Sequence, residues 1–444
     1  MWAPEAGGVS ITVKAASMAT PKVAIIGAGL AGLCCARRLF QCGIPFEILE
    51  ASDAVGGRVR TDRVDGFLLD RGFQIYLTAY PEGRRVLDLE ALNLRYFSRG
   101  AKIWTGRRFE EVRDPREAPL TAMLSLFNQV GGVLDKFRIA DLAWHLSRTP
   151  LLELWRQPER PTRDFLRWNA RFSEKMIQRL FEPFFGGVFL ERELVTSSRL
   201  FAYLFRMFAE GPGAVPAGGM QAIPEQIAAG LPARSIRFES RVVAIDGQEL
   251  QLADGSTVSA PVIVIAVDGS EAARLAGSLL PELAWRGSTT VYYATEQAPM
   301  TEPILHLDGT GTGPVNSVVA LSLAAPEYAP PGQTLLSAAV IGVPEEKDEE
   351  LDRKIRAQFR EWFGPSVANW RRLRIDRIRQ ALPDQSAGRL DPWQRPVRLR
   401  PGLYVCGDHR DQGSIDGAMT SGFRTAQTVM HDLAEFPAIV SGKQ

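Results

Sequence analysis

Apolar and polar positions along this chain predict strands near both ends and a long helical region between them. Residues 23–26 form a continuous apolar run, which is typical of a strand buried on both faces of a sheet. A helical stretch follows at 33–40, and a second short strand is expected at 46–49. This order predicts a βαβ unit with a right-handed crossover.

The pattern changes in the middle of the chain. From about residue 115 to 208, Leu, Phe, Trp and Arg recur at helical spacing and strand signals disappear, which predicts a helical insertion. Strand patterns return at 242–245, 250–252 and 262–267, and the first two read as a hairpin around Asp246-Gly247. Further strands are expected within 287–342.

Near the C-terminus, the pattern predicts a charged helix at 345–363, a last strand at 403–406 and a helix from about 417. The predicted fold class is α/β: a discontinuous Rossmann-type nucleotide-binding domain, plus an α+β substrate domain with an antiparallel sheet and the helical insertion. We assign 21–110, 215–286 and 386–436 to the first domain, and 111–214 and 287–385 to the second. Residues 1–20 are expected to be a disordered extension and 437–444 a tail.

Composition and charge exclude several classes of protein. Lys and Arg number 52 and Asp and Glu 51, so a net charge of +1 gives no electrostatic basis for binding nucleic acid. No run of 18 apolar residues occurs, which argues against a membrane-spanning helix. The four cysteines form no C-x-x-C pair, so no metal site is expected.

A glycine pattern after the first strand carries the first chemical signal. Gly27 permits a tight turn, Gly29 lets the backbone approach a pyrophosphate, and Gly32 allows close packing of helix on strand. The pyrophosphate would lie at the helix N-terminus, where free N–H groups favour an anion. Glu50, at the end of the second strand, would bind a ribose and reject a 2′-phosphate, which leaves NAD or FAD as the dinucleotide.

Further motifs identify a resemblance. Gly56-Gly57-Arg58 follows Glu50, the run from Val215 to Met220 reads VPAGGM, and Gly407-Asp408 and Gly417-Ala418 lie near the C-terminus. Together these motifs resemble the superfamily of FAD enzymes that includes amine oxidases, phytoene desaturases and protoporphyrinogen oxidases. The resemblance covers the chain from Lys22 to about Leu433.

The resemblance implies an FAD-binding domain and assigns roles within it. Arg58 would bind the diphosphate, Asp408 the ribityl hydroxyls, and Val243 the adenine through its backbone. The helix from Gly417 would direct its positive end at the flavin. The full set of expected cofactor residues is Gly27, Gly29, Gly32, Glu50, Gly57, Arg58, Gly72, Gln74, Val243, Gly407, Asp408, Gly417, Ala418 and Met419. Cys406 is not at the position of a covalently attached cysteine, so the FAD is expected to be noncovalent.

The substrate is indicated less directly. Eight aromatic residues lie within the 28 positions from Phe181 to Phe208, and Phe201, Phe205 and Phe208 share one helical face. They form either the domain core or the wall of an apolar tunnel or membrane-resting surface. The lysine that amine oxidases of the superfamily usually carry is missing from 289–296.

These observations favour an FAD-dependent desaturase or oxidase that acts on a lipophilic small molecule, with oxygen or a quinone as electron acceptor. The alternatives are an amine oxidase that releases hydrogen peroxide, a redox-neutral flavin isomerase and a non-catalytic flavin-binding scaffold. His409, beside Asp408, is a candidate for a general base, although the pattern favours a solvent-facing loop histidine. We expect a cytoplasmic protein that can contact a membrane peripherally. A plastid location is an alternative.

Overall fold

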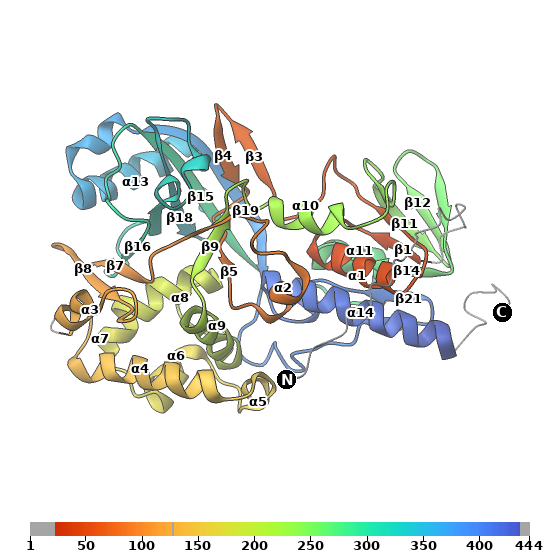
Figure 1. Cartoon of the computed structure of the whole chain (residues 1–444), viewed down its shortest axis with the longest axis horizontal. Coiled ribbons are helices and arrows are strands. Elements are labelled where there is room, and N and C mark those ends of the chain that lie inside the picture. The colour runs from red at the N-terminus through yellow and green to blue at the C-terminus, as the bar shows by residue number, and fades with distance from the viewer. Residues whose placement is uncertain (1–22, 127, 436–444) are drawn as a thin grey trace, which may run out of the picture.

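The computed structural model describes residues 23–126 and 128–435, apart from the side chain of Leu124. The predictions for 1–20 and 437–444 therefore fall outside the described residues. Figure 1 shows two lobes side by side, each with its own sheet, and a group of helices below the second lobe. The mixed α/β class predicted from the sequence is confirmed.

The first lobe contains a six-stranded sheet. Its order is β10 (Ile236–Arg237), β2 (Phe46–Leu49), β1 (Val23–Ile26), β14 (Val262–Ile265), β21 (Leu403–Val405) and β20 (Arg398–Arg400). All neighbours are parallel except β20 and β21. The strands at 23–26 and 46–49 are confirmed, and strands from three distant stretches of the chain complete one sheet.

Helices and a small meander cover this sheet. Helix α1 (Leu30–Gln41) packs on α14 (Ile415–Glu435), so closely that a Cβ added to Gly422 would lie 2.1 Å from the carbonyl oxygen of Ala31. The predicted hairpin is confirmed and continues into a third strand. The meander consists of β11 (Val242–Asp246), β12 (Glu249–Leu252) and β13 (Thr257–Ser259), with α10 (Ala222–Ala229) and α11 (Gly269–Ala276) nearby.

The second lobe contains a seven-stranded sheet covered by α13 (Asp348–Phe363). Its order is β19 (Arg371–Pro383), β15 (Trp285–Thr295), β18 (Thr334–Ile341), β17 (Val315–Ala320), β16 (Leu305–Asp308), β7 (Gly100–Trp104) and β8 (Phe109–Arg113). Only β16 and β7 pair in parallel. Because β7 and β8 belong to this sheet, it begins near residue 100, earlier than the boundary at 110 that we expected from the sequence.

The helical insertion lies below the second sheet (Figure 1). Its elements are α3 (Pro119–Ser125), α4 (Val133–Arg148), α5 (Leu151–Arg156), α6 (Thr162–Asp164), η1 (Phe165–Asn169), α7 (Glu174–Met176), η2 (Ile177–Phe181), α8 (Glu182–Phe189) and α9 (Ser198–Glu210). Leu200, Phe201, Leu204 and Met207 of α9 are buried, as the apolar period of that helix requires. No helix among the described residues is both long and apolar enough to cross a membrane.

Short elements connect the two lobes. The hairpin β3 (Thr61–Val64) and β4 (Phe67–Asp70) stands between them, next to the three-stranded sheet of β5 (Tyr76–Leu77), β9 (Gly213–Pro216) and β6 (Leu94–Tyr96). Helices α2 (Pro81–Val86) and α12 (Leu321–Ala324) complete the chain path.

Candidate active site

One large cavity extends from the first lobe to the helical insertion. Its volume is about 1680 Å³, and its lining begins at Gly27, Glu50 and Asp408 and ends among the side chains of α3, α4 and α9. Ligand pockets commonly measure about 300–1,000 Å³. The cavity is therefore large enough for a dinucleotide and a second molecule beside it.

The glycine turn at the first end leaves open space where a cofactor is expected. Gly27 has a φ of +104°, a conformation that favours glycine, and a Cβ added to Gly32 would lie 2.1 Å from the carbonyl oxygen of Gly27. A Cβ added to Gly29, in contrast, meets nothing within 4 Å. Gly29 lines the cavity, so its missing side chain leaves room for a diphosphate.

The Glu50 carboxylate lies at the same end and is anchored by the backbone. Its Oε2 accepts a hydrogen bond of 2.6 Å from the amide of Ala28 in the glycine turn, and its Oε1 accepts bonds from the amide and hydroxyl of Ser52. Oε2 accepts one bond only, so it can accept a further hydrogen bond. Glu50 lines the cavity, and its role as a ribose ligand stays a prediction.

Arg58 and Asp408 meet at the edge of the cavity although they are far apart in sequence. Nη2 of Arg58 donates to Oδ1 of Asp408 at 2.6 Å, and Nη1 donates to the carbonyl of Ala381 at 2.9 Å. Gln74 donates from its amide nitrogen to the carbonyl of Arg58 at 2.9 Å. The family resemblance implies separate partners on the cofactor for Arg58 and Asp408, whereas the structure pairs these two side chains with each other.

Most of the expected cofactor residues line this one cavity. They are Gly27, Gly29, Glu50, Gly57, Arg58, Gly72, Gln74, Gly407, Asp408 and Ala418. Gly32, Gly417 and Met419 lie behind the lining in close packing, and Met419 is fully buried. Val243 also lies outside the lining, but a register shift between β11 and β12 leaves it out of the strand ladder. Its amide thus stays a proposed adenine contact, while its carbonyl accepts from Arg274.

His409 does not take part in the site. It is 3% exposed, is not among the residues that line the cavity, and packs against Gly269 and Gly407. Burial lowers the pKa of its ring to about 4, and neither ring nitrogen has a hydrogen-bond partner among the described residues. The loop histidine faces the interior instead of solvent or the cavity, so its placement gives no support to a role as general base.

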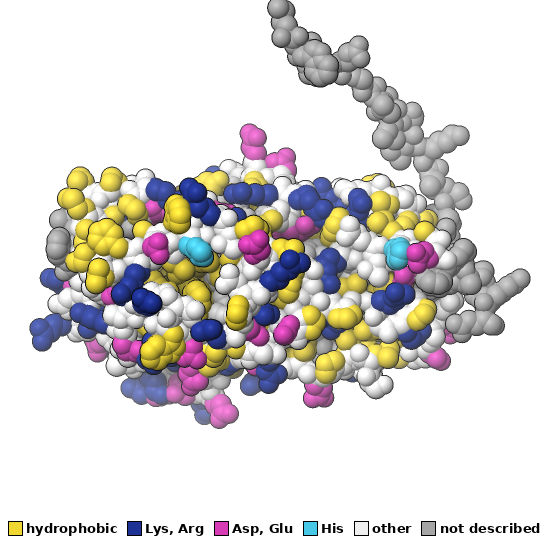
Figure 2. All heavy atoms as spheres, turned by 90° about the horizontal axis from the view of Figure 1, so that it is seen from below, with side chains coloured by type: hydrophobic (Ala, Val, Ile, Leu, Met, Phe, Trp, Pro, Cys, Tyr) yellow, Lys and Arg dark blue, Asp and Glu magenta, His cyan; other side chains and the backbone are white. Residues whose placement is uncertain are grey.

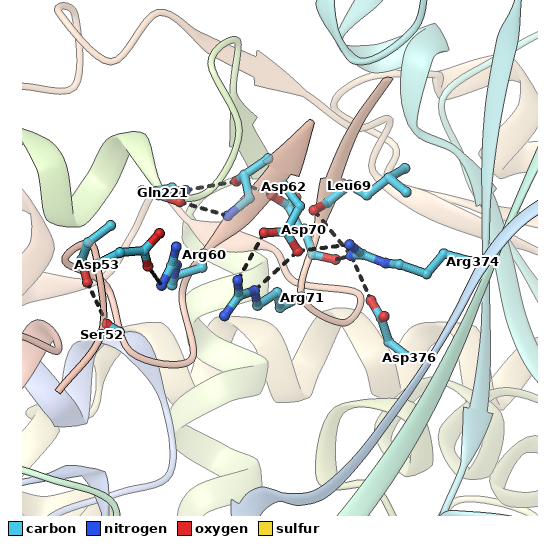
Figure 3. Close-up of polar contacts among 12 residues, drawn as sticks. Ser52, Asp53, Arg60, Asp62, Leu69, Asp70, Arg71, Gln221, Arg374 and Asp376 are labelled. Carbon is cyan, nitrogen blue, oxygen red and sulfur yellow. Dashed lines mark hydrogen bonds and ion pairs between the residues drawn. The ribbon is translucent and has the colours of Figure 1, made fainter. Parts of the chain in front are cut away.

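A polar network fixes the segment that passes along the cavity between the lobes (Figure 3). Asp70, at the end of β4, accepts hydrogen bonds from Thr61, the amide of Met220 and Tyr328. Burial raises the pKa of Asp70 to about 6, against the lowering effect of these donors. Arg374 of β19 donates to the carbonyl oxygen of Asp70 at 3.1 Å.

The same network continues to Gly72, which lines the cavity. Arg374 also pairs with Asp62 and Asp376, at 2.8 Å each. Burial raises the pKa of Asp376. Next to Gly72, the amide of Phe73 donates to the hydroxyl of Thr290 on β15 at 3.1 Å. Strand β19 of the second lobe thereby holds a cavity segment of the first lobe in place.

The far end of the cavity is apolar. Phe184, Phe185, Phe205 and Phe208 line it, and the rings of Phe184 and Phe208 meet edge to face at 5.1 Å. Phe201 is fully buried in the core. Both readings of the aromatic cluster therefore apply: its members divide between the core and the cavity wall.

The opening of the cavity is surrounded by exposed apolar side chains. Met123 of α3 and Phe137 and Trp144 of α4 line the cavity and are 56%, 62% and 57% exposed. Leu120 and Leu134 beside them are more exposed still. Figure 2 shows apolar side chains gathered at the left of the view, the side on which Figure 1 places these helices.

Carboxylates along the cavity are already engaged. Asp114 accepts from Arg116 at 2.5 Å and lies 3.5 Å from Arg99, while Glu210 pairs with Arg206 at 2.6 Å. Asp268 accepts bonds from two amides at the start of α11. An ammonium group in the far part of the cavity would therefore meet no unpaired carboxylate among the described lining residues.

Sequence reasoning missed the contribution of α3 and α4. The helical period there was visible, but it does not tell which face turns to a cavity, because both faces of α4 carry apolar residues. A usable signal was the excess of large apolar residues at 133–144 over what one buried helix face needs. Within 23–126 and 128–435, no group of His, Cys, Asp and Glu side chains is arranged to hold a metal ion.

Comparison with known proteins agrees with this geometry. The family model described as flavin containing amine oxidoreductase matches residues 30–430. Protoporphyrinogen oxidase 2 (chloroplastic/mitochondrial) of Arabidopsis thaliana is 26% identical over 168 residues, 37% of this chain and 32% of that protein. Carotenoid phi-ring synthase of Streptomyces griseus is 29% identical over 208 residues, 43% of this chain and 39% of that protein. Both alignments span less than half of the relative's length.

A solved structure extends the likeness of fold to nearly the whole chain. Wild-type putrescine oxidase bound to putrescine superposes with a TM-score of 0.66 at 19% identity, covering 93% of this chain and 99% of that one. At this level of identity the likeness concerns the fold.

Proposed function

Because this chain belongs to the family of flavin-containing amine oxidoreductases, we propose that it dehydrogenates or oxidises a lipophilic organic substrate. It is a flavin-dependent oxidoreductase, and its cofactor is FAD. The proposal adds the substrate class, and the apolar far end of the cavity is the observation that carries it.

The residues at the first end of the cavity fit FAD. The space beside Gly29 would take the diphosphate, Glu50 the adenosine ribose, and Asp408 the ribityl chain. Burial raises the pKa of the Cys406 thiol well above its ordinary range, and Cys406 does not line the cavity. The flavin is therefore noncovalent in this proposal. Acid or heat should release FAD into the supernatant, and colour retained by the precipitated chain would contradict this.

When bound, FAD supplies a hydride acceptor. The chain's own residues hold the site in place, exclude water and orient the substrate. The network of Asp70, Arg374 and Asp376 fixes the Gly72 segment, so that segment needs no reorganisation when a substrate arrives. The aromatic wall excludes water and orients an apolar skeleton by its shape. Hydride transfer needs orientation more than a base, which agrees with the absence of a histidine from the described lining.

The lipophilic class follows from what the far end offers. Burial of apolar surface stabilises a complex by about 25 cal/mol per Å², so the phenylalanine wall can bind a hydrocarbon skeleton without a charged contact. An amine would need an unpaired carboxylate or an aromatic cage. The carboxylates of Asp114 and Glu210 are paired with arginines, which disfavours a small amine.

Anaerobic bleaching of the flavin tests the proposal. Carotenoid, porphyrinogen and amine substrates are added to the holoenzyme in the absence of oxygen, and absorbance of the oxidised flavin is followed. We expect lipophilic substrates to bleach it and putrescine to leave it unchanged. Bleaching by amines alone would favour an amine oxidase, for which the fold of putrescine oxidase is the supporting observation. Re-oxidation with oxygen or with a quinone then identifies the electron acceptor.

Peripheral contact with a membrane is a further part of the proposal. The exposed side chains of Met123, Phe137 and Trp144 surround the cavity opening, and the Arg148 guanidinium stacks over the Trp144 ring at 4.6 Å. Aromatic and basic side chains on one surface are typical of interfacial helices. Phe137→Ser with Trp144→Ser should reduce sedimentation with anionic vesicles, whereas Phe238→Ser, an exposed site elsewhere, should not. Unchanged sedimentation of the double variant would contradict the contact.

A further inference from the structure

Among the described residues that line the cavity, one is a lysine, Lys136, and it lies in the apolar far part. Lys136 lines it from α4, on the same stripe of the helix as Ala140, Ala143 and Ser147. Apart from Ser147, its companions on this stripe carry no polar side chain. A cavity wall that only binds an apolar skeleton does not need a charged side chain at this position.

The chain holds this ammonium in a defined position. Nζ of Lys136 donates to Oδ1 of Asn128 at 3.0 Å and to the carbonyl of Gly131 at 3.1 Å. Asn128 is itself fixed, because its amide group donates to the carbonyl of Glu111 and its Oδ1 accepts from the amide of Val130. An ammonium has three N–H donors, so one remains for a ligand.

Lys136 differs from the arginines near it in having no carboxylate partner among the described residues. Arg99 and Arg116 share Asp114, and Arg113 pairs with two glutamates. Lys136 forms no ion pair with any described carboxylate, and its two known acceptors are neutral oxygens. Burial lowers the pKa of Lys136, although Asp135 and Glu110 oppose this effect. An anionic ligand would relieve that cost.

We propose that Lys136 binds the anionic head, a carboxylate or a phosphate, of a substrate whose apolar skeleton lies along the phenylalanine wall. This inference rests on the proposed function and narrows it from lipophilic molecules in general to lipophilic anions. The skeleton contributes affinity through burial, and the ammonium sets which end of the molecule lies near α4.

Three ligands that share one chain and differ in the head group test the assignment. Binding of dodecanoate, dodecyl phosphate and dodecanol to the holoenzyme is measured by calorimetry, below the concentrations at which micelles form. We expect at least one anion to bind about tenfold more tightly than dodecanol, since a hydrogen bond between two charged groups is stronger than one to a neutral hydroxyl. Whichever anion is preferred identifies the head group.

Variants separate the ammonium from the wall. Lys136→Met should bring the anions within about twofold of dodecanol while dodecanol itself binds as before, and Lys136→Arg should keep part of the preference. Lys354→Met serves as the control, because Lys354 lies on α13 and pairs with Glu346. A preference that survives Lys136→Met, or equal binding of all three ligands to the wild type, overturns this inference alone. If none of the three ligands binds, the lipophilic function fails as well.

Discussion

The two ends of the cavity are built in different ways. At the cofactor end, backbone geometry determines the shape of the site. Gly27 makes a turn with positive φ, Gly29 leaves space, and the amide of Ala28 holds the Glu50 carboxylate in place. At the far end, side chains from α3, α4, α8 and α9 form the wall, and none of them depends on a special backbone conformation.

The two constructions differ in how strictly each one selects its ligand. A site made by backbone accepts one ligand, since its shape follows from a few glycines and cannot drift without loss of the turn. A wall of phenylalanines tolerates exchanges of similar volume and can adapt to many skeletons. Substitutions at the cofactor end should therefore abolish FAD binding or leave it intact. Substitutions at the far end should weaken substrate binding by degrees.

Gly29→Val should have the largest effect. The valine side chain would enter the open space beside the turn, so we expect flavin content after purification to fall below about one tenth of the wild type, measured by absorbance. The fold should persist, because a Cβ at Gly29 meets nothing within 4 Å. Gly230→Val is a control at another glycine without positive φ, and it should keep the flavin. Full flavin content in Gly29→Val would contradict the claim that the backbone at Gly29 shapes the cofactor end.

Glu50→Ala should weaken FAD binding by about 10- to 100-fold, as expected when a charged hydrogen-bond acceptor is lost. Its hydrogen bonds to Ala28 and Ser52 are lost as well, so part of the effect is a looser glycine turn. Titration of the apoprotein with FAD measures the change. A parallel titration of dodecanol should be unaffected, and a matched loss in both titrations would show that the two ends are not independent.

Phe208→Ala should have a graded effect at the far end. The variant removes one of several rings, so we expect dodecanol to bind about fivefold more weakly, while flavin content stays at the wild-type level. Phe208→Leu should recover most of the affinity. Loss of flavin in Phe208→Ala would contradict the separation of the two ends.

Asp70→Asn should leave both ligands bound as before and change only the pH dependence of stability. The folded pKa of Asp70 is about 6, above the ordinary value of 3.8. Its protonated form therefore stabilises the fold below pH 3.8, and this contribution is lost as the pH rises through 6. Relative to Asp70→Asn, the wild type should gain on the order of 2 kcal/mol between pH 7 and pH 4.

Urea unfolding at several pH values measures this difference, with Glu361→Gln, an exposed site on α13, as the control. If the free energy of unfolding depends on pH in the same way in Asp70→Asn and the wild type, the Asp70 carboxylate is already ionised at low pH. A change in flavin content would show that the Asp70 network acts on the cofactor end directly.

The same contrast explains what the sequence could predict. Gly27, Gly29, Gly32 and Glu50 act within one βαβ unit, so local spacing was enough to find them. The pairing of Arg58 with Asp408 joins residues 350 positions apart, and no local pattern reveals it. Sequence placed His409 beside the site, but the chain turns its ring into the core.

At the far end, the sequence located the aromatic density at 181–208 but not its division between core and cavity. That division depends on how α8 and α9 rotate against the second sheet, which is a tertiary outcome. Lys136 was overlooked for a similar reason: a lysine on a helix usually reaches solvent, and only the fold places this one along a cavity.

The sheet of the first lobe has a consequence for the order in which the protein matures. β1 is made first, but its neighbour β14 follows more than two hundred residues later and β21 only near the C-terminus. On the ribosome, the glycine turn therefore emerges long before Asp408 and α14 exist to complete its surroundings. Helices α3 to α9 are synthesised in that interval, before the strands and helices that complete the cavity at its cofactor end. We therefore expect FAD to bind only after Asp408 and α14 have been synthesised, and a chain interrupted before Asp408 should contain no flavin.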